Sequence, residues 1–115
     1  NPQIILIMLG NTMSTIQHVL HEEYERLKEL VVVYLKKLEA FPRGRPRVKV
    51  VRGSEYVYLN RREGHKVVDE YIGRVDSEKV QELYAQISRR DQVIRLLAEA
   101  RQQLKDVERA LRGKV

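Results

Sequence analysis

Apolar residues recur at helical spacing over the first third of the chain. Steps of four and three residues alternate along the series Leu20, Tyr24, Leu27, Val31, Tyr34 and Leu38. This is the heptad pattern of a helix that packs along one stripe. Ser14 and Gln17 have the spacing of a capping box, and Pro42 disfavours helical geometry in the residue before it. The pattern therefore predicts a helix over residues 14–41.

Short segments that alternate between apolar and polar residues follow this helix. They predict three strands, at about residues 47–52, 55–61 and 66–73. Gly53-Ser54 suits a two-residue hairpin loop with glycine first, and Glu63-Gly64 marks a second turn. Together these segments predict a three-stranded antiparallel sheet over residues 47–73.

A second heptad-like pattern occupies the last third of the chain. Its apolar positions are Val80, Leu83, Ile87, Ile94, Leu97, Leu104 and Leu111. Asp76 or Ser77 is suited to cap the start of this helix, which is predicted over residues 77–112. Arg90 and Arg101 interrupt the apolar series. We interpret them as residues at the edge of the stripe whose charged ends reach solvent; alternatively, they extend a basic track.

The order helix, sheet, helix predicts an α+β fold with a single domain over residues 13–115. One apolar stripe on each long helix implies that the helices pack on each other or on a second copy. We therefore expect two long antiparallel coiled-coil helices flanking a small three-stranded antiparallel sheet. Because the chain has one Phe and no Trp, its core is small, and a homo-oligomer through the long helices is expected.

Residues 1–12 form an uncharged, apolar N-terminal extension centred on the run Ile4 to Leu9. That run is far shorter than the roughly 20 residues that span a bilayer, and it lacks the basic start of a secretory signal. Met13 has the character of a natural start, so the extension is a leader, a tag remnant or an upstream segment. Alternatively it is a short strand that must be covered. No membrane partner is expected.

The predicted turns divide the side chains of the sheet between two faces, because successive residues of a strand point in opposite directions. In this register Val50 faces Val57 and Leu59 faces Val68. The face expected to pack on the helices contains Val48, Val50, Val57, Leu59, Val68 and Ile72. The outward face contains Arg47, Lys49, Val51, Tyr56, Tyr58, Asn60, Val67, Asp69 and Tyr71.

The positive charge of the chain is concentrated in the sheet region. Residues 42–74 hold nine Lys and Arg against four Asp and Glu, a net charge of +5 out of +6 for the whole chain. Cations neutralise phosphates and tyrosine rings stack on bases, which is how sheet-based proteins bind nucleic acid. The candidate nucleic-acid-binding residues are Arg43, Arg45, Arg47, Lys49, Tyr56, Tyr58, Arg61, Arg62 and Lys66. Alternatively, the tyrosines are cross-strand pairs that stabilise a small sheet, and the cations keep it soluble.

Other chemistry finds little support in the sequence. His18 and His21 lie at helical spacing from Glu22 and Glu25, but zinc requires a third ligand. No serine has a base partner, and no glycine-rich phosphate loop is present. The chain has no cysteine, which suits a reducing compartment. We therefore expect a cytoplasmic protein that is not an enzyme and has no metal, cofactor or small-molecule substrate.

The middle of the chain resembles a known but uncharacterised family. The segment YVYLNRREGHKVVDEYIGR at residues 56–74, preceded by a helix that ends in Pro-x-Gly, is similar to short bacterial and archaeal helix–hairpin–helix proteins with a YYYL…YIGK hairpin. Similar hairpins occur near the N-termini of some transposases. The order of elements also resembles a prefoldin subunit, although the basic sheet departs from the acidic character of that family. The first resemblance implies the architecture and points towards DNA-linked biology.

These observations lead to two hypotheses of function. In the first, the protein is an oligomeric nucleic-acid-binding or accessory module that uses its basic, tyrosine-bearing sheet face. In the second, it is a coiled-coil structural or chaperone-like protein-interaction module with no nucleic-acid binding. Binding to DNA and RNA across a salt series distinguishes the two, because phosphate contacts weaken steeply with salt.

Overall fold

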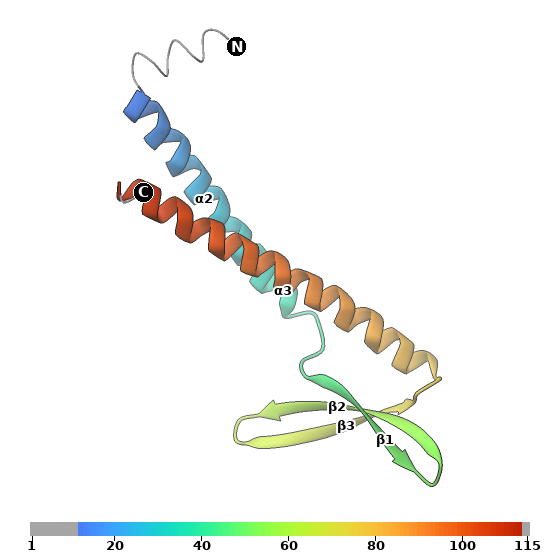
Figure 1. The fold of residues 1–115 in the computed structure, drawn as a ribbon. Helices are drawn as coiled ribbons and strands as arrows, with labels where there is room; N and C mark the ends of the chain where they lie inside the picture. Colours follow the sequence, from blue (N-terminus) through green and yellow to red (C-terminus); the bar gives the residue numbers. More distant parts are fainter. Residues whose placement is uncertain (1–11, 114–115) are drawn as a thin grey trace. The chain divides into compact units, whose positions relative to one another are not determined.

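The computed structural model describes residues 12–113 and has the predicted α+β class. In chain order its elements are α2 (Thr12–Leu38), β1 (Arg45–Val51), β2 (Ser54–Glu63), β3 (Lys66–Arg74) and α3 (Glu78–Leu111) (Figure 1). The strands form one antiparallel sheet in the order β1-β2-β3. The expectation for the apolar run at residues 4–9 lies outside the described residues.

The chain divides into two compact units. One contains the sheet and the first half of α3, over residues 37–93, and the other contains α2 up to residue 36 with the chain from residue 94 onward. We call them the sheet unit and the helix unit. The single helix α3 belongs to both. Each unit is described below by itself.

Helix α2 begins before its expected cap and ends before its expected stop. It starts at Thr12, so that Ser14 lies inside the helix, and it ends at Leu38, with two turn hydrogen bonds from Ala40 to Lys37 and from Phe41 to Leu38. Pro42 prevents the helix from continuing beyond this turn. Its nitrogen carries no hydrogen to donate to the carbonyl of Leu38, and its ring disfavours helical geometry at the residue before it.

Both hairpin loops lie one residue away from their predicted positions. Val51 pairs with Ser54, which makes the first loop Arg52-Gly53, and the pairing that joins β2 to β3 makes the second loop Gly64-His65. The predicted pairings of Val50 with Val57 and of Leu59 with Val68 are therefore wrong. The backbone explains the first loop, because Arg52 and Gly53 have φ of 52° and 80°, the left-handed geometry of a hairpin turn that matches strand twist.

The two faces of the sheet nevertheless keep their predicted composition. A loop that moves by one residue changes each cross-strand partner by two positions, and two positions along a strand return to the same face. In the observed register the face that carries Val57 also carries Val48, Leu59 and Val68. We call it the helix-side face. A bulge between Val57 and Tyr58 shifts the pairing at the end of β3.

The core of the sheet unit lies between the helix-side face and α3. It consists of Val57, Leu59, Val80, Leu83 and Ile87, with Ile72 packed against it. Fully burying a side chain of this size stabilises the fold by about 1.5–3 kcal/mol. Strand β1 contributes nothing to this core. Val48 and Val50, which were expected to pack on the helices, are 49% and 67% exposed, because the helix covers β2 and β3 and not β1.

Helix α3 changes its buried side along its length. Val80, Leu83 and Ile87 are buried in the sheet unit, whereas Leu97 and Ala100 are buried in the helix unit. At 100° per residue Leu97 is rotated by roughly 80° from Ile87 around the helix axis. Ile94 lies on the side of Ile87 but is 45% exposed, so it is not part of the core within the single chain.

Ser77 begins α3 as one of the two predicted caps. Its hydroxyl donates to the carbonyl of Arg74 at 2.7 Å and accepts from the backbone nitrogen of Val80 at 3.4 Å. The hydroxyl lies against Gly73, where an added Cβ would be 2.8 Å from it. The bulge, the glycine and the cap together connect the last strand to the helix.

Candidate functional site

Three tyrosines form a cluster on the side of the sheet opposite the core. Tyr58 and Tyr71 are direct cross-strand partners with ring centroids 5.5 Å apart, and Tyr56 lies 6.2 Å from Tyr71. The rings are tilted or edge-to-face, which is the favourable arrangement for aromatic pairs. Tyr71 remains 54% exposed. We call this side, with its alternating residues on β1, β2 and β3, the tyrosine face.

A polar chain of contacts crosses the tyrosine face beside the rings. The ammonium of Lys49 lies 3.0 Å from the carboxylate of Asp69 and 4.4 Å from the centroid of Tyr58. The side-chain amide of Asn60 donates to the other oxygen of Asp69 at 2.7 Å. These hydrogen bonds, the one from Asn60 foremost, hold the pKa of Asp69 below its ordinary value. The carboxylate of Asp69 therefore stays charged and neutralises part of the charge of Lys49.

The register divides the charges of the sheet unequally between its faces. Up to residue 71, where the bulge shifts the pairing, four cations occupy strand positions of the tyrosine face. They are Arg45, Arg47, Lys49 and Arg62. Asp69 is the only carboxylate at those positions. The other carboxylates of the strands lie on the helix-side face, namely Glu55, Glu63 and Glu70. Among the described residues, Arg45, Arg47 and Arg62 have no salt bridge to any of them.

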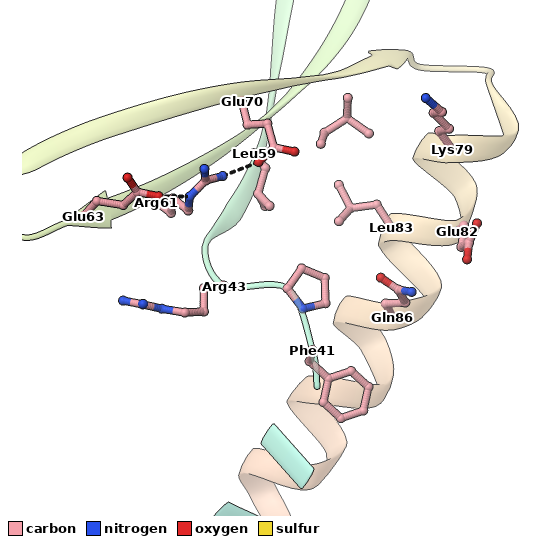
Figure 2. A pocket seen from close by; sticks show the side chains of 12 residues that line it. Phe41, Arg43, Leu59, Arg61, Glu63, Glu70, Lys79, Glu82, Leu83 and Gln86 are labelled. Atoms are coloured by element: carbon pink, nitrogen blue, oxygen red, sulfur yellow. Dashed lines mark hydrogen bonds and ion pairs between the residues drawn. The ribbon is translucent and has the colours of Figure 1, made fainter. Parts of the chain in front are cut away.

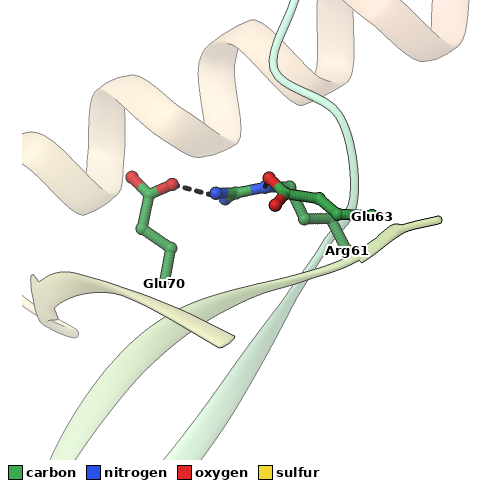
Figure 3. A network of polar contacts seen from close by, with 3 residues as sticks. All are labelled: Arg61, Glu63 and Glu70. Atoms are coloured by element: carbon green, nitrogen blue, oxygen red, sulfur yellow. Dashed lines mark hydrogen bonds and ion pairs between the residues drawn. The ribbon is translucent and has the colours of Figure 1, made fainter. Parts of the chain in front are cut away.

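Arg61 is a sequence-predicted binding residue that the structure places on the opposite face. Its guanidinium donates to Glu63 at 2.8 Å and makes a second short contact with Glu70 (Figure 3). These two hydrogen bonds raise the pKa of Arg61 above its ordinary value. Arg43 and Lys66 are exposed, on the loop before β1 and at the tip of the β2–β3 hairpin. The predicted set is therefore split between two faces and the ends of the strands.

A shallow hollow lies on the tyrosine face next to the first hairpin loop. It has a volume of about 430 Å³. Its lining residues are Val51, Arg52, Ser54, Tyr56, Tyr58 and Tyr71. Arg52 was counted in the net charge but was not among the candidate binding residues. It lies at this site only because the loop is Arg52-Gly53 and not Gly53-Ser54.

An open groove of about 560 Å³ lies on the other side of the sheet, between the helix-side face and α3. Figure 2 shows Leu59, Leu83 and Phe41 inside it and charged groups such as Lys79 and Glu82 on its helical wall. Its charged residues are Arg43, Arg61, Glu63, Glu70, Lys79 and Glu82. The two signs are equally represented, so this groove lacks the excess of positive charge found on the tyrosine face.

The loop between α2 and β1 is fastened to α3 by Arg90. Its guanidinium donates to the carbonyls of Pro42 and Gly44 at 2.9 and 2.7 Å, and its side chain is 12% exposed. The interpretation of Arg90 as a charge that reaches solvent is therefore wrong. Gly44 fits this tight loop because an added Cβ would lie 2.4 Å from the carbonyl oxygen of Asn60. The periodicity of the helix shows that a polar residue interrupts the apolar series, but it does not show which carbonyl groups that residue binds.

The histidine pairs of α2 lie on an open helix surface. His18 is 3.2 Å from Glu22, and both side chains are mostly exposed. Within the described part of the chain, no three or more metal-ligating side chains lie together in a group.

Among the described residues, no helix is long and apolar enough to cross a membrane.

A family model described as "Domain of unknown function (DUF6788)" matches residues 13–82 of the chain. The matched part includes α2, the whole sheet and the beginning of α3, and it is more than half of the sequence. The expectation of an uncharacterised family is confirmed at this level. No curated protein and no solved structure matches the chain significantly.

Proposed function

We propose that this chain, which belongs to the family of the domain of unknown function DUF6788, binds nucleic acid through the tyrosine face of its sheet. The observation that supports the proposal is the separation of charge between the two faces. The cations of the tyrosine face share it with a single carboxylate, whereas the remaining strand carboxylates lie on the side of α3. A face with excess positive charge and exposed aromatic rings suits a polyanion with flat bases.

Strand β1 gives this face a row of cations. Arg45, Arg47 and Lys49 alternate along it, so their side chains leave the same face at intervals of about 6.7 Å. The strand is an edge of the sheet, so the row is open to a long ligand on that side. Each phosphate that such a row neutralises releases a counterion, which provides affinity independent of sequence.

The tyrosines add a contact that charge alone does not supply. An exposed ring offers a flat surface on which a base can stack, whatever its identity. Tyr71 has the most exposed ring of the cluster, with Tyr56 and Tyr58 beside it. Arg61 is left out of the proposed contact set, because two carboxylates already hold its guanidinium.

The decisive experiment measures binding to mixed-sequence DNA and RNA across a salt series. The wild-type chain is compared with the triple variant Arg45→Glu/Arg47→Glu/Arg62→Glu. Phosphate contacts predict an affinity that falls linearly in a double-logarithmic plot against salt. The variant is expected to bind far more weakly and to lose roughly 2 to 3 from the magnitude of that slope.

A matched control reverses three exposed arginines of α3, Arg89→Glu/Arg95→Glu/Arg101→Glu. The two variants have the same net charge, so a general electrostatic effect would weaken binding equally in both. The proposal requires the sheet variant to bind much less tightly than the helix variant. Equal binding by the two variants, or no binding of the wild type at low salt, would show that the proposal is wrong.

A second candidate function is a coiled-coil protein-interaction module without nucleic-acid binding. Exposed apolar side chains on α2 favour it, since Val32 and Val33 are 63% and 46% exposed. A second copy of the chain is the proposed occupant, with the long helices pairing in antiparallel orientation and forming a homo-oligomer. Light scattering over a range of concentrations tests this, and a monomer at every concentration would contradict it.

A further inference from the structure

The first hairpin loop contains an arginine in an unfavourable backbone conformation. Arg52 has a φ of 52°, and it is the only non-glycine residue with positive φ among those that the structure describes. In a two-residue loop of this kind, Asn, Asp or Gly is strongly preferred at the first central position. Glycine has no Cβ to be strained there, and the short polar side chains of Asn and Asp form local hydrogen bonds that offset the strain. The loop thus carries a conformational cost that a common substitution would reduce.

Arg52 lies next to the tyrosine cluster, so its unfavourable conformation points to a role in binding. Strained residues are enriched at binding sites, where the surrounding structure fixes an otherwise rare conformation. Here the loop places Arg52 among the residues that line the hollow, together with the three tyrosines Tyr56, Tyr58 and Tyr71. Ser54 also lines the hollow, and its hydroxyl group can donate or accept a hydrogen bond. Three tyrosines, one arginine and one serine therefore line one small site.

We propose that this hollow binds one unstacked base of a single-stranded nucleic acid, with the guanidinium of Arg52 on the adjacent phosphate. The inference rests on the proposed function. It adds the class of ligand, a single-stranded nucleic acid, and the place on the protein where one of its bases binds. A tyrosine ring offers its face to the base, and the planar guanidinium matches a phosphate with two parallel hydrogen bonds. The row of cations on β1 then continues along the following phosphates.

The aromatic site favours a single strand over a duplex. In a duplex each base is stacked between its neighbours, so a base must be unpaired before it can lie against a protein ring. The cations of β1 bind the phosphates of either form. The hollow therefore predicts tighter binding to single strands than to duplexes of equal phosphate number.

The first test replaces Arg52 with the residue that the loop prefers. Arg52→Asn is expected to fold at least as well as the wild type, because Asn tolerates the left-handed region. Its affinity for a single-stranded oligonucleotide is expected to fall about tenfold, the loss of one charge-assisted contact. Arg89→Asn, an exposed position on α3, removes the same charge and is expected to change affinity less than twofold.

The second test separates the base from the phosphate. An oligonucleotide of abasic sites carries the same phosphates without bases, so contact through charge alone predicts equal binding of the two. The inference predicts that the abasic strand binds about tenfold more weakly, from the loss of stacking. Tyr71→Leu is expected to remove most of that difference. The affinities for a DNA strand and an RNA strand of the same sequence, measured side by side, show whether the sugar contributes to binding.

The possible results distinguish the inference from the function on which it rests. If the wild type binds no nucleic acid at low salt, both are wrong. If it binds with a steep salt dependence, but abasic and normal strands bind equally, the proposed function stands and the inference is overturned. An Arg52→Asn variant that binds single strands as tightly as the wild type would also overturn it. Weaker binding by Arg52→Asn with unchanged stability supports it.

Discussion

At the scale of single residues, Arg90 shows how a partly buried charge can stabilise a loop. The carbonyls of Pro42 and Gly44 belong to a segment with no regular structure, so their partners must come from elsewhere. Arg90 supplies donors to both from α3. This contact ties the chain before β1 to the helix that follows β3, although the two are far apart in sequence.

Replacing Arg90 tests this account. Arg90→Ala is expected to lower the free energy of unfolding by about 1.5–3 kcal/mol, because it removes a charged donor and leaves two carbonyls without it. Chemical denaturation followed by circular dichroism measures the change. The neighbouring variant Arg89→Ala, at an exposed position, is the control and is expected to change stability by less than about 0.5 kcal/mol. Similar effects for both variants would contradict a specific role of Arg90.

Asp69 makes the stability of the sheet dependent on pH in the acid range. Its pKa in the folded state lies below the ordinary value of 3.8, because Asn60 and Lys49 favour its charged form. A group with a lowered folded pKa stabilises the fold fully above its unfolded pKa and loses that contribution as the pH falls through the folded value. Wild type and Asp69→Asn are therefore expected to differ in stability at neutral pH and to converge in acid.

Thermal unfolding of the two proteins at several pH values measures this convergence. A difference that persists undiminished well below the folded pKa would contradict the assignment. The same variant has an expected effect on binding. Asp69 is the one carboxylate on the strand positions of the tyrosine face, and its removal leaves the charge of Lys49 without a partner. Asp69→Asn should therefore bind nucleic acid more tightly than the wild type, with the largest gain at low salt.

At the scale of elements, the two faces of the sheet could be predicted from the sequence although the loops could not. The faces depend on an alternation of period two, which is local and robust to a loop shift of one residue. The exact loop depends on which residues accept positive φ, and the observed choice, with Arg52 in that region, runs against propensity. The residues assigned to each face were therefore correct, while the partners across the strands were not.

The cover of the sheet by α3 has a direct mutational consequence. Val57 of β2 is fully buried, whereas Val50 of β1 is 67% exposed, although both lie on the helix-side face. Val57→Ala is expected to lower the free energy of unfolding by about 2 kcal/mol, through lost burial and the cavity left behind. Val50→Ala is expected to change it by less than about 0.5 kcal/mol. Denaturant melts of both variants measure the contrast, and equal losses would mean that β1 is also covered.

At the scale of the whole molecule, the helix unit leaves apolar side chains of α2 exposed. Val32 and Val33 of α2 lie next to Lys28 and Glu29 around a shallow apolar depression. Such a patch bordered by charges is typical of an interaction surface. It is here that the proposed homo-oligomer would form, independently of any ligand on the sheet.

A charge introduced at this patch tests the oligomer. Val32→Lys/Val33→Lys is expected to shift the light-scattering mass towards the monomer, because association would bury two ammonium groups. The control Val50→Lys/Val67→Lys places the same charges on exposed sheet positions and should leave the mass unchanged. If both variants keep the wild-type oligomer, the patch is not the interface. Dissociation of the control alone would place the interface on the sheet.

The sequence by itself determined the α+β class, the order of the elements and the division of the sheet into an apolar and a basic, tyrosine-bearing face. These follow from local propensity and from periods of two and about 3.6, which a chain carries along its length. The tertiary structure alone decided that α3 covers β2 and β3 and not β1, that Arg90 binds a loop, and that carboxylates hold Arg61. Those facts depend on which residues contact one another in the folded chain, and the periodicity of the sequence contains no information about such contacts. The loop register, which runs against local propensity, placed Arg52 beside the tyrosines.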